Sequence, residues 1–356
     1  MQAKREKPDP ATFLGSGKIE ELGILAKEAE VDVVVFDIAL SAAQERNIER
    51  LIGIPVLDRT ELILDIFRQR AKSREGRLQV ELARLEHLST RLVRGWTHLE
   101  RQRGGLGKTG GPGEKQIELD RRMIGTRMKQ LRDQLKRLAR QRGARSRGDS
   151  ITVSLAGYTN AGKSTLFNKI TRAETYAADQ LFATLDTTAR KFWLSDEETV
   201  VATDTVGFIR GLPHQLIEAF KSTLDETVHA DLILHVVDAS SPVREEQIAE
   251  VNSVLADIHA DDVPVILVYN KIDVTGQPPE IVRDQNGRPK AVFVSALTGA
   301  GLDELRQAVS EFSAAWREEH PNEPRELEDW ELERTDEALP RRKTPAEELA
   351  ELESLL

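Results

Sequence analysis

Short apolar runs alternate with amphipathic segments over the first sixty residues. The runs VDVVVFD (31–37) and IGIPVLD (52–58) are rich in β-branched residues, and they follow segments with helical spacing, GSGKIEELGILAKEA and SAAQERNIERL. Strands that alternate with amphipathic helices are typical of parallel α/β units. The pattern therefore predicts a small α/β subdomain within residues 1–59, built mainly from 12–58.

From about Thr60 the apolar period becomes that of long helices. Apolar residues recur at spacings of three, four and seven on both sides of a glycine-rich stretch. These residues are Leu78, Leu82, Leu85, Leu92 and Leu99, followed by Ile117, Ile124, Met128, Leu131, Leu135 and Leu138. We therefore predict two long helices joined at a glycine-rich tip, forming an antiparallel hairpin over residues 60–147.

A third region begins after the polar linker SRGDS (146–150). It holds apolar runs, separated by helix-length segments, at 151–156, 200–204, 231–237, 263–269 and 291–296. This rhythm predicts a doubly wound α/β domain with a mostly parallel sheet over residues 150–316. Residues 317–356 are acidic with few apolar positions. For them we expect a mostly disordered tail, with a short helix at PAEELAELESLL.

Length and composition narrow the class of protein. At 356 residues the chain is long enough for two or three domains with separate cores. No run approaches the roughly eighteen uncharged apolar residues of a membrane span, and the start of the chain lacks the pattern of a signal peptide. Because there are no cysteines, disulfides and thiolate metal sites are excluded. We expect a soluble, cytoplasmic protein whose metal ligands are oxygen or imidazole.

The charge is distributed unevenly along the chain. Residues 68–147 carry 23 Lys and Arg against 8 Asp and Glu, whereas residues 317–356 carry 6 against 14. The formal net charge of the whole chain is −10. A strongly cationic module inside an acidic chain indicates a polyanionic partner more clearly than the total charge does.

Two stretches contain a glycine, a lysine and a hydroxyl residue in succession, RQRGGLGKTGGPGEKQ (101–116) and GYTNAGKS (157–164). A phosphate-binding loop needs a strand, the pattern G-x-x-x-x-G-K-[ST] and then a helix. The second stretch meets this requirement, with ITVSLA before it and TLFNKI after it, whereas the first has neither the spacing nor a preceding strand. We therefore expect nucleotide phosphates at Gly157, Tyr158, Thr159, Asn160, Ala161, Gly162, Lys163, Ser164 and Thr165. Lys163 should contact the β- and γ-phosphates, and Ser164 should ligate Mg²⁺.

The segment NKID (270–273) favours guanine over adenine. The carboxylate of Asp273 can accept hydrogen bonds from N1–H and the 2-amino group of guanine, and adenine offers neither donor. By itself the pattern is short and fits an ordinary turn after a strand, but its place after the phosphate loop supports the guanine reading. SAL (295–297) would bring a backbone N–H to guanine O6. The predicted base site comprises Asn270, Lys271, Asp273, Ser295, Ala296 and Leu297.

Two further segments fit the region around the γ-phosphate. DTVG ends a predicted strand, so Asp204 can hold the magnesium shell through water and the Gly207 N–H can face the γ-phosphate. FATLDTT has the polar, aperiodic composition of a switch loop, and Thr184 is the expected Mg²⁺ ligand there, ahead of Thr187 and Thr188. The alternative for these threonines is helix capping or turn formation. Candidate nucleotide contacts here are Phe182, Ala183, Thr184, Leu185, Asp186, Asp204, Thr205, Val206 and Gly207.

Taken together, these and longer segments resemble the HflX family of ribosome-associated GTPases, in the Obg-like branch of translation-factor GTPases. The resemblance covers about residues 12–316 and rests on DRTELILDIFRQRA, LQVELARL, RLVRGWTHLERQRGG, GPGE, GYTNAGKSTLFN, ADQLFATLD, DTVGFIR, NKID and SALTGAGL. It implies GTP hydrolysis with Mg²⁺, binding to the large ribosomal subunit, and splitting or rescue of stalled ribosomes. Two features depart from the family pattern: members usually have a further strand and helix ahead of the first segment, and the glycine tip is here one residue longer.

The basic hairpin and the resemblance both indicate RNA. Two helices dense in Arg and Lys repel each other unless a polyanion or a neighbouring domain neutralises them, and a glycine-rich tip allows close backbone approach. Trp96 and His98 could stack on bases, although packing within the hairpin is the more common role. A solvated charged face is the alternative for the whole surface. The candidate RNA contacts are Arg101, Arg103, Gly104, Gly105, Gly107, Lys108, Gly110, Gly111, Gly113 and Lys115.

The expected catalytic groups are Lys163, Thr184 and Gly207. The position that holds a water-orienting polar side chain in many GTPases is Phe208 here, so we expect slow hydrolysis unless the ribosome stimulates it. Asn160 is a candidate K⁺ ligand or, alternatively, stabilises the loop turn. We expect a monomer when not bound to ribosomes. The competing function is an RNA-binding assembly or regulatory module that uses GTP as a structural switch; an RNA-modifying enzyme is disfavoured.

Overall fold

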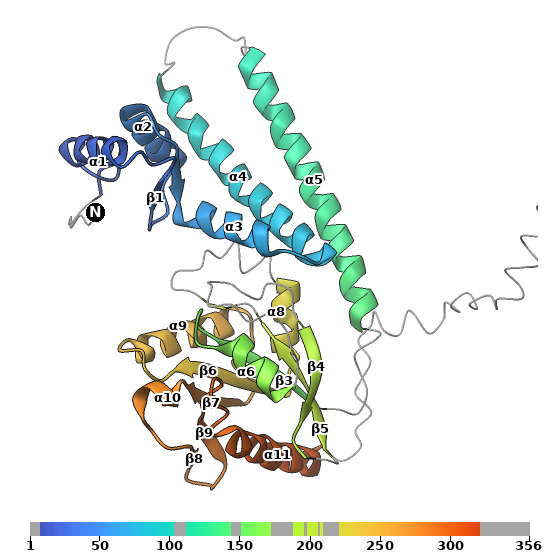
Figure 1. Cartoon of the computed structure of the whole chain (residues 1–356). Coiled ribbons are helices and arrows are strands. Elements are labelled where there is room, and N and C mark those ends of the chain that lie inside the picture. Colours follow the sequence, from blue (N-terminus) through green and yellow to red (C-terminus); the bar gives the residue numbers. More distant parts are fainter. Residues whose placement is uncertain are drawn as a thin grey trace, which may run out of the picture.

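The structure is a computed structural model that describes residues 8–102, 112–143, 151–171, 188–195, 198–205, 207–208 and 221–320. Three parts follow one another along the chain: a small α/β unit, a long helical hairpin and a larger α/β domain (Figure 1). Most of the glycine-rich tip, the switch-loop candidate and the acidic tail after His320 lie outside the described residues. Expectations for those segments therefore remain predictions.

The first part is the small α/β unit that the sequence predicts. It consists of α1 (Ser16–Glu28), β1 (Val34–Phe36), α2 (Ala42–Ile52) and β2 (Val56–Asp58). The two strands pair in parallel, and Val34 lies opposite Val56. Helix α2 begins at a capping box formed by Ser41 and Gln44 and ends at Gly53, whose φ of 73° suits glycine. Buried side chains of both helices and both strands form one core.

A separate helix precedes the hairpin. Helix α3 (Arg59–Arg70) ends before α4 (Arg74–Gln102) begins, and α5 (Pro112–Gly143) follows the tip. The apolar pattern of the sequence predicts only two long helices after Thr60. The break was not predicted because the periodic apolar residues begin at Leu78, beyond it. The hydroxyl of Ser73 accepts a hydrogen bond from the Gly76 N–H at 2.8 Å and so starts a new helix.

Helices α4 and α5 pack along an apolar seam and project away from the larger domain (Figure 1). Leu82, Leu131 and Leu135 are buried in this seam. Two ion pairs cross between the helices: Arg127 to Glu81 at 2.7 Å and Arg132 to Glu86 at 2.6 Å. Part of the expected repulsion between the two basic helices is thus offset by the acidic residues of α4.

The larger domain contains a seven-stranded sheet with the order β4-β5-β3-β6-β7-β9-β8. All strand pairs are parallel except those of the two edge strands, β4 and β8. The elements are β3 (Thr152–Gly157), α6 (Lys163–Ile170), β4 (Thr188–Trp193), β5 (Thr199–Asp204), α8 (Lys221–Val228), β6 (Leu232–Asp238), α9 (Arg244–Asp257), β7 (Val265–Asn270), α10 (Ile272–Thr275), β8 (Glu280–Arg283), β9 (Pro289–Phe293) and α11 (Leu302–Glu319).

Helices cover both faces of this sheet. Helices α6 and α11 share one apolar cluster with the strands, and α8 and α9 share another. The predicted doubly wound, mostly parallel fold is therefore confirmed. The two antiparallel edge strands were not predicted, because TARKFW mixes charged with apolar residues and EIVR is short and largely exposed. Among the helices that the structure describes, none is both long and apolar enough to cross a membrane.

Candidate functional site

The candidate nucleotide site lies where the carboxyl ends of the central strands meet. Strand β3 pairs with β5 on one side and with β6 on the other, and the loop 157–164 connects it to α6. This is the crevice in which open α/β sheets bind their ligands. The loop 157–164, the Asp204 end of β5 and the Asn270 end of β7 therefore belong to one site.

The conformation of the loop 157–164 depends on two glycines. Gly162 has a φ of 92°, and a Cβ there would stand 2.2 Å from the Asn270 Nδ2 atom. At Gly157 a Cβ would stand 2.3 Å from the carbonyl oxygen of Val236 on the neighbouring strand. Asn160 also has a left-handed backbone, with a φ of 62°. Both ends of the glycine pattern are thus required by sterics.

Lys163 is buried at the amino end of α6. Its Nζ atom donates hydrogen bonds to the carbonyl oxygens of Gly157 at 3.0 Å and Tyr158 at 2.9 Å. Burial lowers the pKa of this ammonium to about 8, against the opposing effect of the Asp204 carboxylate. The loop therefore holds a cation among backbone groups, an arrangement suited to a polyanionic ligand.

Ser164 and Asp204 supply oxygen atoms side by side. The Ser164 hydroxyl donates to Asp204 Oδ2 at 2.8 Å, which links the start of α6 to the end of β5. The next residue, Thr205, donates from Oγ1 to the Leu155 carbonyl at 2.6 Å and so fixes the strand end. A hydroxyl and a carboxylate are ligands of the kind that Mg²⁺ prefers, so this pair fits the metal that the sequence predicts. Within the described residues, no cluster of three or more His, Cys, Asp or Glu could hold another metal.

Gly207 and Phe208 run directly beside the phosphate loop. The Phe208 N–H donates to the Gly157 carbonyl at 3.1 Å, and the Thr159 N–H donates to the Phe208 carbonyl at 2.7 Å. A Cβ at Gly207 would stand 2.9 Å from Thr159 Cγ2 and 3.1 Å from Lys163 Nζ. The ring of Phe208 is only 2% exposed and packs in the core beside Ala156. That side chain is therefore unable to orient a water molecule in the site.

Asn270 joins two loops of the site through its side chain. Its Nδ2 donates to the Ala161 carbonyl at 2.9 Å, and its Oδ1 accepts from the Ala296 N–H at 2.9 Å. Asn270 and Ala296 are both buried. The amide thus locks the phosphate loop to the SAL segment after β9, as expected of a residue that shapes a base site.

Lys271 makes a second connection to the phosphate loop. Its Nζ donates to the Asn160 carbonyl at 2.8 Å and to Asp238 Oδ2 at 2.7 Å. Asp238 also accepts from the N–H and the hydroxyl of Ser240. Burial alone would raise the pKa of Asp238, but the hydrogen bonds from Lys271 and Ser240 outweigh it, and the pKa is lowered. The carboxylate is therefore ionised and holds the lysine in place.

Asp273 lies at the exposed mouth of the site, in contact with the SAL segment. Its Oδ1 accepts a hydrogen bond from the buried Ser295 hydroxyl, whose Oγ in turn accepts from the Thr298 N–H at 3.1 Å. Leu297 is 72% exposed. One carboxylate oxygen is thus anchored by the protein, and an arrangement of this kind can present the other edge to a ligand.

The structure brings most of the predicted nucleotide residues together but leaves some undescribed. Thr165 lies in α6, half-buried. Val206 and the switch-loop candidates Phe182, Ala183, Thr184, Leu185 and Asp186 lie outside the described residues, as do Arg103, Gly104, Gly105, Gly107, Lys108, Gly110 and Gly111 of the tip. Arg101 is in the last turn of α4, and Gly113 and Lys115 are in the first turns of α5. The side chains of Trp96 and His98 on α4 are likewise outside the description.

Two residues near the site were not predicted from the sequence. Asp238 holds Lys271, as described above. His235 on β6 lies opposite Ala156 of β3 and is almost completely buried, and burial lowers its pKa to about 4. Neither belongs to a motif used in the sequence analysis. The VDAS run was visible as the end of a strand, but only the sheet order places it beside NKID.

Comparison with protein families covers most of the chain. The family model described as GTP-binding GTPase N-terminal matches residues 1–68, and GTP-binding GTPase Middle Region matches residues 70–148. The model described as 50S ribosome-binding GTPase matches residues 152–271. A solved structure, a GTP-binding protein from Sulfolobus solfataricus in complex with GDP, covers 88% of this chain and 89% of its own at 23% identity, with a TM-score of 0.47.

Sequence identity to curated proteins is much higher than to that solved structure. The GTPase HflX of Escherichia coli (strain K12) is 55% identical over 87% of this chain and 74% of its own length. The GTPase HflX of Magnetococcus marinus is 51% identical over 85% of this chain and 72% of its own length. With this degree of identity over most of both chains, and with the match to a GTPase family model, the protein is a GTPase and belongs to the HflX family.

Proposed function

We propose that this GTPase binds the large ribosomal subunit in the cytoplasm and acts in splitting, rescue or recycling of ribosomes. The observation that carries the proposal is a cationic helical hairpin held next to a GTPase domain. Among the side chains of α5 that the structure describes, the exposed cations are Arg121, Arg122, Arg127, Lys129, Arg132, Lys136 and Arg137. The family model matched by the GTPase domain is itself described as ribosome-binding.

The nucleotide is proposed to lie across the loop 157–164. Lys163, which now donates to loop carbonyls, would turn its ammonium to the β- and γ-phosphates, and the Gly207 N–H would face the γ-phosphate. Mg²⁺ would be held by the Ser164 hydroxyl and, through water, by Asp204, with Thr184 completing the shell in the triphosphate state. When bound, the metal neutralises charge on the phosphates.

Guanine is proposed to bind between Lys271 and the SAL segment. The Asp273 carboxylate would accept from N1–H and the 2-amino group, while its contact with Ser295 keeps it in position. Backbone N–H groups of 295–297 would meet O6. A variant Asp273→Asn should bind xanthosine triphosphate better than GTP, because the amide can donate to the O2 oxygen of xanthine. Unchanged preference for GTP in that variant would contradict the assignment.

Hydrolysis is proposed to be slow until the ribosome is bound. The ring of Phe208 is buried in the core, so the protein places no side chain from this position against the attacking water. The ribosome would supply the ordering that is missing. Single-turnover hydrolysis, measured with and without large subunits, tests this. A purified protein that already hydrolyses GTP at its ribosome-stimulated rate would contradict it.

Asn160 is proposed to bind a potassium ion beside the phosphates. It is exposed on the loop, its backbone is left-handed, and its carbonyl is held by Lys271. Hydrolysis should therefore be faster in K⁺ than in Na⁺, and Asn160→Ala should abolish the difference. Equal rates in both salts for the native protein would leave Asn160 with a role in loop conformation alone.

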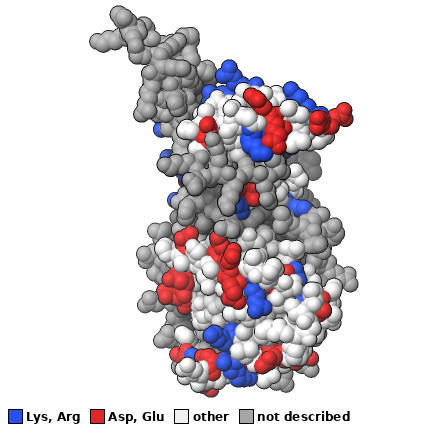
Figure 2. Space-filling view, turned by 90° about the vertical axis from the view of Figure 1, so that its left-hand side faces the viewer, with Lys and Arg blue, Asp and Glu red and all other residues white. Residues whose placement is uncertain are grey.

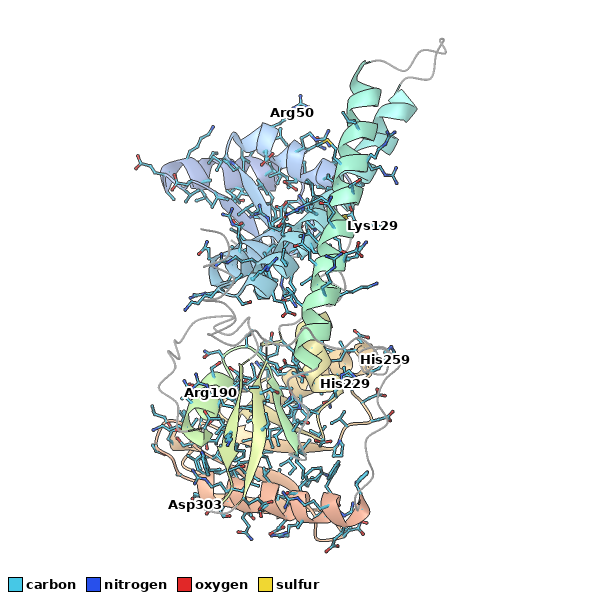
Figure 3. All side chains as sticks on the ribbon, turned by 90° about the vertical axis from the view of Figure 1, so that its right-hand side faces the viewer. Arg50, Lys129, Arg190, His229, His259 and Asp303 are labelled. Carbon is cyan, nitrogen blue, oxygen red and sulfur yellow. The ribbon has the colours of Figure 1, made fainter. Side chains whose placement is uncertain are left out.

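The hairpin is proposed to bind ribosomal RNA through its tip and the exposed side of α5. Lys129 on α5, labelled in Figure 3, is one of these exposed cations. Triphosphate and Mg²⁺ would order the segments 182–188 and 204–212 and so favour the ribosome-binding arrangement of the two parts. By linkage, the ribosome would tighten GTP binding by the same factor.

The decisive experiment is sedimentation of 70S ribosomes after incubation with the protein and GTP or a non-hydrolysable analogue. Conversion into 30S and 50S peaks, with the protein in the 50S fraction, is the expected result. Co-sedimentation without dissociation would favour rescue or the alternative, an assembly or regulatory module that uses GTP as a structural switch. Absence of the protein from every ribosomal fraction would contradict the proposal. Sedimentation without ribosomes should show a monomer.

A further inference from the structure

A groove of about 650 Å³ lies between α3 and α4, away from the nucleotide site. Its volume falls in the range of about 300–1,000 Å³ that is typical of ligand sites. The apolar part of its wall is formed by Leu57, Leu64, Val80, Leu85 and Leu88. Leu88 is 46% exposed, so its side chain is accessible to a ligand in the groove.

The rim of the groove is positively charged. Exposed arginines from both helices line it, namely Arg68, Arg77 and Arg84. The three carboxylates of the groove already have cationic partners: Glu61 contacts Arg91, Asp65 contacts Arg68, and Glu81 contacts Arg127. Within the described part of the chain, Arg84 has no ion-pair partner. An acidic, leucine-rich ligand therefore matches both the wall and the rim.

The chain itself contains such a ligand, at residues 344–356. Three of its four leucines, Leu349, Leu352 and Leu356, recur at helical spacing among Glu347, Glu348, Glu351 and Glu353. It begins with Thr-Pro-Ala-Glu, the pattern of a capping box with proline at the first helical position. A helix with a stripe formed by Leu349, Leu352 and Leu356 and with glutamates next to it is suited to a groove with an apolar wall and a basic rim.

We propose that residues 344–356 bind in the α3–α4 groove as a short helix. The leucines contact Leu57, Leu85 and Leu88, and the glutamates pair with the arginine rim. Helix α11 ends at Glu319, so the 24 residues from 320 to 343 form the connection. Such a connection spans up to ~80 Å when extended. Tethering raises the effective concentration of the segment, so that even weak contacts give substantial occupancy.

The groove favours this occupant over RNA. A sugar-phosphate backbone would satisfy the arginines but would leave the apolar wall and Leu88 without a partner. The exposed cations of α5 offer RNA a separate surface, because no residue that the structure describes on α5 lines the groove. The proposal therefore concerns a different surface from the one assigned to the ribosome, and the two can succeed or fail separately.

Cysteine crosslinking in the full-length chain tests the proposal, since the native protein has no cysteine. Ala71→Cys at the edge of the groove is combined with Ser354→Cys in the tail and treated with a short bismaleimide. The control pairs Ser354→Cys with Thr126→Cys, an exposed position on α5. We expect the groove pair to crosslink within one chain at least about tenfold faster than the control pair. Equal rates would overturn the proposal.

Charge exchange provides a second measurement in the same crosslinking assay. Arg84→Glu or Glu351→Arg alone should slow crosslinking several-fold, and the two together should restore it. Leu88→Asp should slow it about tenfold, whereas Met123→Asp, at an apolar position on α5 that is even more exposed, should not. If all charge variants act alike without restoration, the attraction is non-specific and the proposal fails. Crosslinks formed between two chains, increasing with protein concentration, would instead assign the groove to a second copy.

Discussion

Burial of Lys163 lowers the pKa of its ammonium, and this affects how the site would bind phosphate. In the structure its ammonium is surrounded by loop carbonyls, and burial lowers its pKa to about 8. Nearby phosphates would raise that pKa again, because opposite charges favour the protonated form. Nucleotide binding should therefore be linked to protonation of this one side chain.

The affinity for GDP should consequently depend on pH in one direction. Below about pH 8 Lys163 is already protonated and affinity should be flat, whereas above it binding requires proton uptake and Kd should rise by up to about tenfold per pH unit. Fluorescence titration with labelled GDP between pH 6.5 and 9 measures this. Lys163→Met should bind weakly at every pH. A native Kd that stays constant up to pH 9 would show that the ammonium does not contact the phosphates.

Asp238 is expected to control the lifetime of the bound nucleotide without touching it. Asp238→Ala would leave Lys271 without the carboxylate that aligns it, and the Lys271 contact with the Asn160 carbonyl would loosen. Because the pair is partly exposed, we expect a loss of only about 1 kcal/mol, or roughly fivefold faster GDP release. Stopped-flow release of labelled GDP measures it.

The matched control is Asp303→Ala, which removes an exposed aspartate from α11 (Figure 3). It should leave GDP release unchanged. Asp238→Asn, which keeps a hydrogen-bond acceptor for Lys271, should fall between the native protein and Asp238→Ala. Release from Asp238→Ala at the native rate would mean that Lys271 keeps its position through Asn160 alone.

At the residue scale, site residues that belong to a sequence motif were predicted, and site residues outside the motifs were not. Lys163, Ser164 and Asp204 were found because a local pattern fixes each of them. Asp238 could not be found, since only the register of β6 against β7, which places Asp238 opposite Asn270, brings it to Lys271. His235 was not found for a similar reason: it lies opposite Ala156 of β3, and no local pattern reveals that pairing.

At the scale of elements, one arginine joins the small α/β unit to the hairpin. Arg91 of α4 forms ion pairs with Asp58, Glu61 and Glu45, and it is mostly buried. Burial raises the pKa of Asp58 and lowers that of Arg91. The cluster connects α2, the start of α3 and α4, so the orientation of the hairpin depends on it.

Arg91→Met should destabilise the small α/β unit by about 3–5 kcal/mol at pH 7, because three carboxylates would lose their shared cation. The pKa of Asp58 is already raised in the folded protein, so its ionised form opposes folding above its unfolded pKa, and acid should relieve the defect. Urea unfolding at pH 7 and pH 5 measures this. Arg50→Met, on the exposed side of α2, is the control (Figure 3). A loss as small as that of the control would mean that the cluster contributes little.

Secondary structure was predictable where one physical signal dominated. The parallel strands of the larger domain are buried on both faces and show as continuous apolar runs. The edge strands β4 and β8 are half-exposed and lack that signal. The break between α3 and α4 depends on one serine cap, which a leucine pattern does not reveal.

At the scale of the whole molecule, the cationic charge is concentrated on the hairpin. The face shown in Figure 2 carries blue and red side chains in mixture over the larger domain. Such a mixed surface offers a polyanion little net attraction. Binding to RNA should therefore depend on a few lysines and arginines of the hairpin, and the number of their contacts with phosphates can be measured.

The salt dependence of binding to large ribosomal subunits gives the number of these phosphate contacts. Each phosphate neutralised by a cation contributes about 0.7–0.9 to the slope of log K against log salt. Lys129→Gln with Lys136→Gln should make the slope shallower by roughly 1.4–1.8 if both contact phosphates. The control, Lys27→Gln with Lys169→Gln, changes the net charge equally but on α1 and α6. Both double variants weaken the long-range attraction equally, because both lower the net charge by the same amount. Their salt slopes should therefore differ only if the hairpin lysines contact RNA phosphates directly. Equal slopes would show that the hairpin does not form the interface.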